Sequence, residues 1–369
     1  MTAAVSTPGA SSSTVEKVPL YQGSTQYRHW RFSPEELVHT RVSLNAAAVR
    51  VIKDAFEADS LGSSTAVAFL DANEENLLVK LYIGKVSQLC GHFRFPEEVE
   101  ATAVSYLKRF YLKNTVMDWH PKNVMLTALF LATKTTNHPI SLEAYAHHIP
   151  KTAPSDVLEL EFLVAQSLGF DFAIWHAHKA LWGIWLDIQT LPDIRMDELR
   201  DAYDVALKHV RESRLTDAEL IYTPSQIALT CFSLASPSLA SAWVRSKHTP
   251  PASPPTPTSP PTPTSPSPIP ETDILELIEP IKSMILQYGT MPDVEAVREV
   301  DRRLRLCKNP EKIVGSNAYN RKLEAKERKA AEKRARKAAL ARKAMEEGDP
   351  FGDTIGPQDL DDDDDDDDD

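Results

Sequence analysis

The chain has 369 residues, of which 42% are hydrophobic, a share that supports one or two compact domains. Three cysteines without short spacing exclude a disulfide framework and a cysteine-rich zinc site, and no apolar run approaches the ~20 residues that a membrane helix needs. The net charge of −12 is concentrated at the C-terminal end, where 361–369 are nine aspartates, whereas 321–345 carry 11 Lys/Arg against three Glu.

Capping signals predict a series of helices in the first half of the chain. Residues 1–24 are rich in Ser, Thr and Ala and are expected to be disordered. Ser33, Pro34 and Glu36 form a capping-box pattern that predicts an N-terminal helix within 25–60. Similar signals and apolar positions at three- and four-residue steps predict five further helices, which begin near Asp71, Phe95, His120, Ser141 and Pro154, the last running to Leu168.

The second half repeats this pattern up to a proline-rich segment. Residues 249–270 hold 11 prolines, which lack an N–H donor, so we expect an extended linker there. The basic segment 320–345 has no apolar face to bury, and 346–369 is expected to be disordered. Helices are predicted over Ile174–Ile188, Met196–Arg211, Thr223–Leu234, 238–246, Asp273–Tyr288 and Asp293–Cys307.

The predicted elements describe an all-α protein. Two tandem five-helix bundles would occupy 71–172 and 173–290, the second interrupted by the proline-rich insertion. The N-terminal helix within 25–60 and a C-terminal helix over 291–308 would lie outside the bundles. Both ends of the chain would be disordered tails.

The sequence contains no recognisable catalytic motif. Glycine-rich phosphate loops, the nucleophile elbow and the HExxH zinc motif are all missing. Two histidine pairs, His147-His148 and His176-x-His178, have spacings that do not face one another on a helix, so partly exposed helix-end histidines are favoured over a metal site. We therefore expect no catalysis, no cofactor and no bound metal.

Two charged residues lie on apolar stripes of the predicted helices. Lys134 follows Phe130 and Leu131 at the end of its helix, and Glu161 shares a face with Val157, Val164, Ala165 and Leu168. The pattern alone favours a structural role for each: a snorkelling lysine near a helix C-terminus and a buried carboxylate that is satisfied within the fold. The alternative is an acid and a base at one edge of a bundle, available to the backbone of a partner.

Several strings resemble the cyclin family. Tyr106–Asn114, Val116–Pro121 and Met125–Lys134 are similar to the first cyclin box, and Leu220–Thr230 is similar to the second. Arg28–Glu36 resembles the N-terminal helix of the cyclin H branch. The resemblance extends from Thr25 to Leu306, interrupted by 249–270, and it implies two tandem five-helix cyclin boxes.

The resemblance implies a non-catalytic chain that binds and activates a cyclin-dependent kinase by positioning the kinase C-helix. Lys134 and Glu161 occupy the positions of the lysine and glutamate through which cyclins contact that kinase, whereas Thr135, Thr136 and Asn137 replace the acidic residues usual after the lysine. The cyclin H branch implies a CDK-activating kinase that phosphorylates CDK activation loops and the RNA polymerase II tail in the nucleus. Its partners would be the kinase subunit, a RING-finger assembly factor and the transcription factor IIH core, with no small-molecule substrate and no membrane.

The proline-rich segment and the basic tail carry further candidate sites. Seven Ser/Thr-Pro dipeptides suit proline-directed kinases, although an inert spacer is favoured. They begin at Thr249, Ser253, Thr256, Ser259, Thr262, Ser265 and Ser267. A basic run of Lys333, Arg334, Arg336 and Lys337 is typical of a nuclear-localisation or nucleic-acid patch, with a solvated charged helix as an equal alternative.

A second function stays open at this point. A cyclin-fold DNA-binding factor that resembles transcription factor IIB would need basic residues spread over both boxes. Residues 1–320 instead carry 30 basic and 36 acidic residues, which is unfavourable for phosphate contacts. Direct binding of nucleic acid is therefore not expected.

Overall fold

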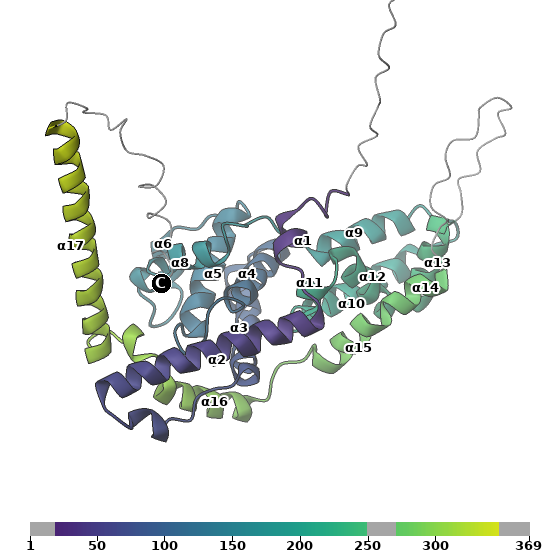
Figure 1. Ribbon diagram of the computed structural model, residues 1–369. Coiled ribbons are helices and arrows are strands. Elements are labelled where there is room, and N and C mark those ends of the chain that lie inside the picture. Colours follow the sequence, from purple (N-terminus) through teal and green to yellow (C-terminus); the bar gives the residue numbers. More distant parts are fainter. Residues whose placement is uncertain (1–18, 249–270, 347–369) are drawn as a thin grey trace, which may run out of the picture. The chain divides into compact units, whose positions relative to one another are not determined.

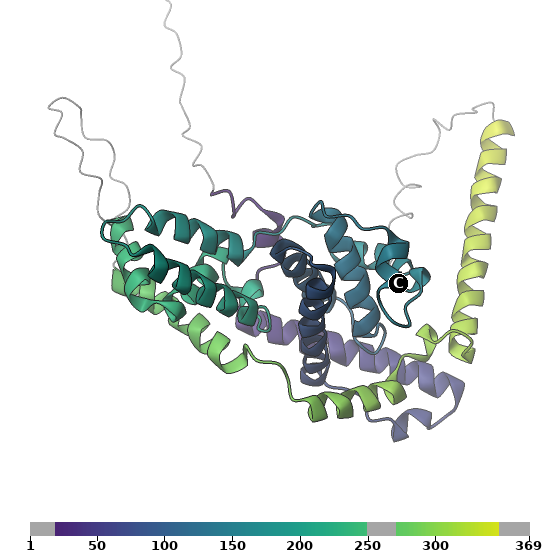
Figure 2. The same cartoon turned by 180° about the vertical axis from the view of Figure 1, so that it is seen from behind.

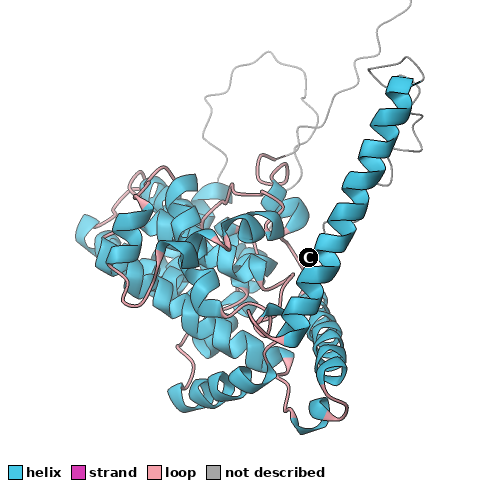
Figure 3. Ribbon diagram, turned by 90° about the vertical axis from the view of Figure 1, so that its left-hand side faces the viewer, coloured by secondary structure: helices cyan, strands magenta, loops and turns pink. Residues whose placement is uncertain are grey.

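The computed structural model describes residues 19–248 and 271–346, and these ranges contain helices and loops but no strand (Figures 1 and 3). The predicted all-α class is therefore confirmed. The chain divides into one unit of Met1–Ala48 with Phe69–Arg305 and another of Val49–Ala68 with Leu306–Asp369. The predictions for 1–18, 249–270 and 347–369 lie outside the described residues.

The first bundle consists of six helices, in which α5 packs against α3, α4, α7 and α8. Their bounds are α3 (Ala72–Phe93), α4 (Glu97–Phe110), α5 (Pro121–Thr135), α6 (Leu142–His147), α7 (Pro154–Leu158) and α8 (Glu161–Ser167). Predicted N-terminal caps are confirmed at Asp71, whose carboxylate accepts from Glu74 in a full capping box, and at His120 and Ser141. Helix α4 packs against α3, α5 and α8, and its residues 101–110 are all buried.

The single helix predicted over Pro154–Leu168 is wrong, because the structure breaks it between α7 and α8. Leu160 has a ψ of −3° instead of a helical value, so the backbone leaves the helix there. The hydroxyl of Thr127 on α5 donates to the carbonyl of Val157 at 3.0 Å, which is the carbonyl that Glu161 N–H would bond in a continuous helix. A tertiary contact thus accompanies a break that no proline or glycine marks.

The second bundle, drawn in teal and green in Figure 2, packs around α12. Its helices are α9 (Ala177–Ile188), α10 (Met196–Ser213), α11 (Ala218–Ile221), α12 (Pro224–Ala235), α13 (Pro237–His248), α14 (Glu271–Leu277) and α15 (Glu279–Tyr288). The capping box predicted for Thr223 and Gln226 is confirmed. The continuous helix predicted over Asp273–Tyr288 is wrong: Pro280 lies in the first turn of α15, and proline disfavours the helix interior because it lacks an N–H.

The N-terminal segment forms a short helix that the sequence did not predict, α1 (Thr25–His29), capped by Ser24. Residues 19–24 form hydrogen-bonded turns, so the expectation of disorder up to residue 24 is wrong for them. The Gln26 side chain accepts from the N–H of Trp175 at 2.7 Å and donates to its carbonyl at 3.3 Å. Because those backbone groups are occupied, the predicted helix start at Ile174 is wrong, and α9 begins after His176.

The other unit combines residues 49–68 with the C-terminal part of the described chain. Helix α2 (Pro34–Asp59) begins at the predicted capping box of Ser33 and Glu36. Its C-terminal part belongs to this unit and is followed by η1 (Ser63–Ala66). Helix α16 (Val294–Cys307) leads into η2 (Pro310–Lys312) and α17 (Asn317–Glu346). Arg321 of α17 donates to the carbonyl of Ala58 at 2.9 Å and forms an ion pair with Asp59.

Helix α4 carries two buried cations, and most of the groups that contact them come from outside the first bundle. Lys108 Nζ lies 2.7 Å from the carbonyl of Thr216 and 2.9 Å from a carboxylate oxygen of Glu219, both in the second bundle. Arg109 donates to the carbonyl of Asp171 at 3.2 Å, and its guanidinium lies 4.9 Å from the centre of the Trp30 ring. These contacts join the two bundles and the N-terminal segment.

Ion pairs surround this contact and lower carboxylate pKa values. Burial alone would raise the pKa of Glu219, but Lys108 and the Ser105 hydroxyl hold that pKa below its ordinary value. Burial also opposes ionisation of Asp217, whose pKa is nevertheless lowered by its paired 2.7 Å hydrogen bonds with Arg41 of α2. The charged forms of these carboxylates are therefore stabilised by the native fold.

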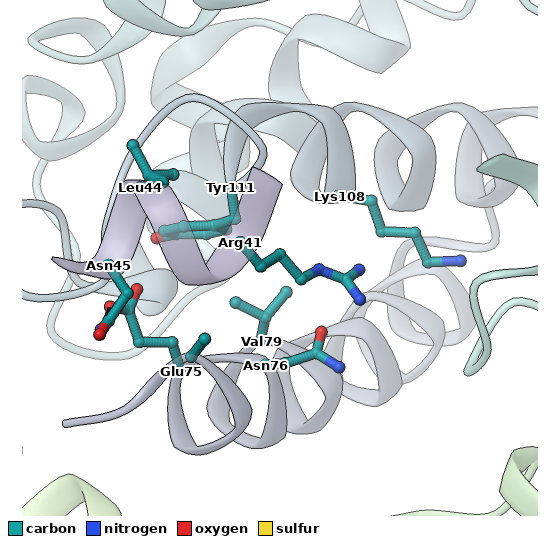
Figure 4. A pocket seen from close by; sticks show the side chains of 9 residues that line it. Arg41, Leu44, Asn45, Glu75, Asn76, Val79, Lys108 and Tyr111 are labelled. Carbon is teal, nitrogen blue, oxygen red and sulfur yellow. Dashed lines mark hydrogen bonds between the residues drawn. The ribbon is translucent and has the colours of Figure 1, made fainter. Parts of the chain in front are cut away.

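A narrow hollow between α2, α3 and α4 shows how the N-terminal helix is attached (Figure 4). Asn45 and Glu75 lie together at one end of it, and the Asn45 amide donates to the Glu75 carboxylate at 2.6 Å. Thr115 and the N–H of Val116 also donate to that carboxylate. Burial nevertheless raises the pKa of Glu75. Residues 34–48 are thus bonded to the first bundle through Asn45 and to the second through Arg41.

We expect Lys108→Met to lower the free energy of unfolding by about 3–5 kcal/mol, because it leaves the Glu219 carboxylate without its ionic partner. Denaturant titration measures this loss. Lys208→Met is the matched control, since Lys208 is exposed and pairs with Glu212 at 3.9 Å, where a change below about 1 kcal/mol is expected. Equal effects of the two substitutions would contradict this role of Lys108.

The free energy of unfolding should fall as the pH drops below about 4.3, the ordinary pKa of a glutamate. The lowered pKa values of Glu219 and Asp217 mean that the unfolded chain takes up protons first, so the stability these groups add is present above that pH and lost below it. Glu219→Gln should flatten this loss in denaturant titrations across pH. Glu75→Gln should leave the loss in place, since the raised pKa of Glu75 has the opposite sign.

Candidate functional site

The structure brings Lys134 and Glu161 together at one edge of the first bundle. Lys134 lies in the last turn of α5, Glu161 opens α8, and the two side chains form an ion pair. The Lys134 side chain is 41% exposed and that of Glu161 is 22% exposed. Lys134 Nζ also lies 4.6 Å from the centre of the Phe130 ring. The pair is therefore held in place and still reachable from solvent.

Local structure favours each charge at its position. Asn137 adopts a left-handed φ of 61° just after α5, and the N–H of His138 bonds back to the carbonyl of Thr133 at 2.8 Å. The residues that replace the usual acidic run, Thr135 to Asn137, thus form the end of the helix. A cation in the last turn of α5 and an anion in the first turn of α8 both complement the helix dipoles.

The prediction that Glu161 lies buried on a core-facing stripe is wrong. Val164, Ala165 and Leu168 are buried as expected, but Val157 belongs to the separate helix α7. Glu161 is partly exposed and has Lys134 as its partner. An exposed charge of this kind contributes little to folding, so the fold alone does not explain the pair.

Three exposed apolar side chains lie on the segments that adjoin Glu161, and sequence reasoning missed them. Phe162 is 70% exposed, Phe170 55% and Leu158 49%, and the two rings lie 6.3 Å apart between centres. We call these three residues with Lys134 and Glu161 the α8 surface. Exposed aromatic side chains beside a charged pair are typical of a protein interface. One feature of the sequence could have revealed this surface: Phe162 directly follows Glu161 and therefore lies off the apolar stripe of the helix.

The second histidine pair, His176 and His178, is packed at the start of α9. His176 and His178 stack with ring centres 5.2 Å apart. His176 is buried rather than partly exposed, so that expectation is wrong for it; its ring bonds the Thr102 hydroxyl at 2.9 Å, and burial places its pKa well below the usual value. No cluster of three or more metal-ligating side chains occurs in 19–248 or 271–346.

The remaining candidate residues from the sequence do not belong to the α8 surface. Lys333, Arg334, Arg336 and Lys337 lie on exposed positions of α17, away from the α8 surface along the chain. The candidate phosphorylation sites Ser253, Thr256, Ser259, Thr262 and Ser265 fall outside the described residues. Among the helices described, none is both long and apolar enough to cross a membrane.

Comparison with known proteins identifies both bundles. Residues 78–173 match the family described as Cyclin, N-terminal domain, and 176–286 match Cyclin C-terminal domain. The chain is 34% identical over 241 residues to Cyclin mcs2 of Schizosaccharomyces pombe, an alignment that covers 63% of this chain and 75% of that protein. It is 33% identical over 222 residues to Cyclin-H of Xenopus laevis, with coverage of 57% and 67%.

Two solved structures are similar to this one. The first is a chain of the CAK complex from Chaetomium thermophilum bound to ATP-gamma-S, with a TM-score of 0.70, 27% identity, and coverage of 84% of this chain and 94% of that chain. The second is a chain of the yeast TFIIK (Kin28/Ccl1/Tfb3) complex, with a TM-score of 0.57, 30% identity, and coverage of 72% and 100%. These likenesses extend over both bundles.

We expect Lys134→Met to change the free energy of unfolding by less than about 1 kcal/mol, because an exposed ion pair contributes little to stability. Denaturant titration of the isolated chain measures the change. A loss as large as about 3 kcal/mol would show that the pair serves the fold, and the α8 surface would then lose its candidacy as a partner site.

Proposed function

Because the chain belongs to the cyclin family, we propose that it is the regulatory cyclin of a CDK-activating kinase of the transcription factor IIH type. The complex would phosphorylate CDK activation loops and the C-terminal domain of RNA polymerase II. The observation that carries the proposal is the match across both bundles to a chain of the CAK complex, together with relatives named as cyclin H. The chain itself would supply no catalytic group.

The partners follow from the same resemblance. They would be a cyclin-dependent kinase subunit, a RING-finger assembly factor and the transcription factor IIH core. The yeast complex of Kin28, Ccl1 and Tfb3 supports a three-chain assembly of this kind. The complex would act in the nucleus, and the basic run Lys333–Lys337 of α17 would serve localisation. A DNA-binding role is less favoured because 1–320 carry six more acidic than basic residues.

Activation would work by a shift of the kinase conformation. A protein kinase is active only when a strand lysine pairs with the C-helix glutamate and the metal-binding aspartate is in place. A cyclin that binds the state with the C-helix inward raises the population of that state by its difference in affinity. A shift from 1% to 99% active kinase needs a preference of about 10⁴-fold, which a protein interface supplies.

The α8 surface would make the decisive contacts. Lys134 would donate to backbone carbonyls near the kinase C-helix, and Glu161 would accept from backbone N–H groups. Phe162, Phe170 and Leu158 would add apolar contact area, since aromatic side chains carry much of the energy of protein interfaces. The exposure of the three apolar side chains and of Lys134, with the partial exposure of Glu161, supports this assignment.

The proline-rich segment is proposed to be a spacer within the second bundle. It connects the end of α13 at His248 to the start of α14 at Glu271. Its Ser/Thr-Pro dipeptides remain candidate sites for proline-directed kinases, although they lie away from the α8 surface along the chain.

We expect Lys134→Glu and Glu161→Ala each to weaken kinase binding and activation by at least about 10-fold, since each removes a polar anchor at the interface. The chain should be tagged, purified with the kinase subunit identified by mass spectrometry, and assayed on a polymerase-tail peptide. Circular dichroism of each isolated variant should show unchanged helical content.

The matched control is another exposed pair, Lys179 of α9 with Glu98 of α4. Lys179→Glu and Glu98→Ala change the same residue types on a different surface, so binding and activation should stay within about twofold. Full activation by both Lys134→Glu and Glu161→Ala would remove the site assignment, and failure to recover any kinase would remove the proposed function.

A further inference from the structure

Helix α17 gathers positive charge on one face. Its exposed cations Lys326, Lys329, Lys333 and Arg336 follow one another at steps of three and four residues, and Lys343 lies seven residues beyond Arg336. Residues at these steps share a face of an α-helix. We call these five residues the basic face. Glu324 and Glu327 fall on the opposite side of the helix, whereas Glu332 lies at the edge of the basic face, three residues after Lys329.

The basic face is not the packing surface of α17. The helix is attached at its N-terminal end, where Ala318 is buried, Arg321 bonds Ala58 and Asp59, and Lys322 pairs with Glu311 at 3.4 Å. Beyond residue 325 the described positions are exposed, and even Leu340 is 40% exposed. A charged helix face of this length, away from any core, is typical of a binding surface for polyanions.

The chain carries a polyanion of its own. Residues 347–369 contain 13 acidic residues and no basic ones, and nine of them form the unbroken run Asp361–Asp369. An extended run of aspartates carries one negative charge per about 3.3–3.6 Å. One strand of DNA carries a charge per about 3.4 Å, so the run matches the charge spacing of a nucleic-acid strand.

We propose that Asp361–Asp369 bind along the basic face of α17 and thereby compete with nucleic acid for it. The lengths agree: Lys326 to Lys343 spans about 26 Å of helix, and nine extended aspartates span about 30 Å. The 14 residues 347–360 can bridge up to about 46 Å, enough for the run to reach any point of the face. The tail and the helix have opposite charge and similar length.

The tether gives the tail an advantage over free polyanions. A segment attached by a short linker acts at a millimolar effective concentration, so a nucleic acid at micromolar concentration competes poorly. The contact is between exposed charges and is therefore screened by salt. The acidic tail would restrict the basic face to ligands with more charge or a higher local concentration.

The test measures binding of a fluorescein-labelled 20-nucleotide random single-stranded DNA by fluorescence anisotropy at 50 mM salt. The full chain is compared with a variant in which each residue of Asp361–Asp369 is replaced by serine. We expect the serine variant to bind at least about 10-fold more tightly, with a log–log salt slope near −3.5 if five cations contact phosphates.

Helix variants separate docking from general repulsion. Lys329→Glu with Lys333→Glu alters the basic face, whereas Arg328→Glu with Arg334→Glu makes the same charge change about 120° round the helix. The affinity ratio between serine and native tails should fall near 1 for the first pair and stay near 10 for the second. A ratio near 1 with the native helix, or equal ratios for the two pairs, would overturn the proposal.

A second measurement observes the contact directly. A fluorescein-labelled nona-aspartate peptide is titrated against the serine-tail variant and against the full chain. We expect it to bind the serine-tail variant, to be displaced by 0.5 M salt, and to bind the full chain at least about 10-fold more weakly. No binding to the serine-tail variant at 50 mM salt would also overturn the proposal.

Discussion

Two cations on the buried C-terminal part of α4 control how the larger unit packs. Lys108 and Arg109 lie on α4 at 6% and 2% exposure, and an unpaired charge in such a place is strongly unfavourable. The second bundle supplies Glu219 and the carbonyl of Thr216, while the N-terminal segment supplies Trp30. The two bundles satisfy these groups only when they meet in one arrangement. This requirement explains why two helical repeats behave as one compact unit.

The same residue types have a different role where they are exposed. Lys134 and Glu161 form an ion pair as Lys108 and Glu219 do, but the former pair lies at the edge of the first bundle and is open to solvent. Its contribution to folding is small, and its polar atoms can exchange partners at an interface. A rigid core with an exposed, preorganised pair is the arrangement that a conformational activator of a kinase requires.

Local signals in the sequence predicted most helix starts correctly. Two of the wrong predictions lie where contacts with distant residues determine the backbone. Asp71, His120 and Thr223 cap their helices through hydrogen bonds within a few residues, so the sequence contains the whole signal. The break before Glu161 and the late start of α9 instead involve Thr127 and Gln26, which are distant in sequence. Pro280 is a helix breaker that the sequence displays, but the apolar spacing around it led to the prediction of one continuous helix. The apolar pattern singled out Lys134 and Glu161 and the family resemblance gave them a role, whereas the exposure of Phe162 emerged only from the structure.

Hydrogen–deuterium exchange of the chain, alone and with its kinase, tests most directly whether the α8 surface is the site of activation. The account predicts slower amide exchange on binding in the last turn of α5 and throughout α8, since those backbone groups lie beneath Lys134 and Glu161. Exchange in α10 and α12, within the second bundle, should change little. Slower exchange confined to α10 and α12, with none at α5 and α8, would contradict the account.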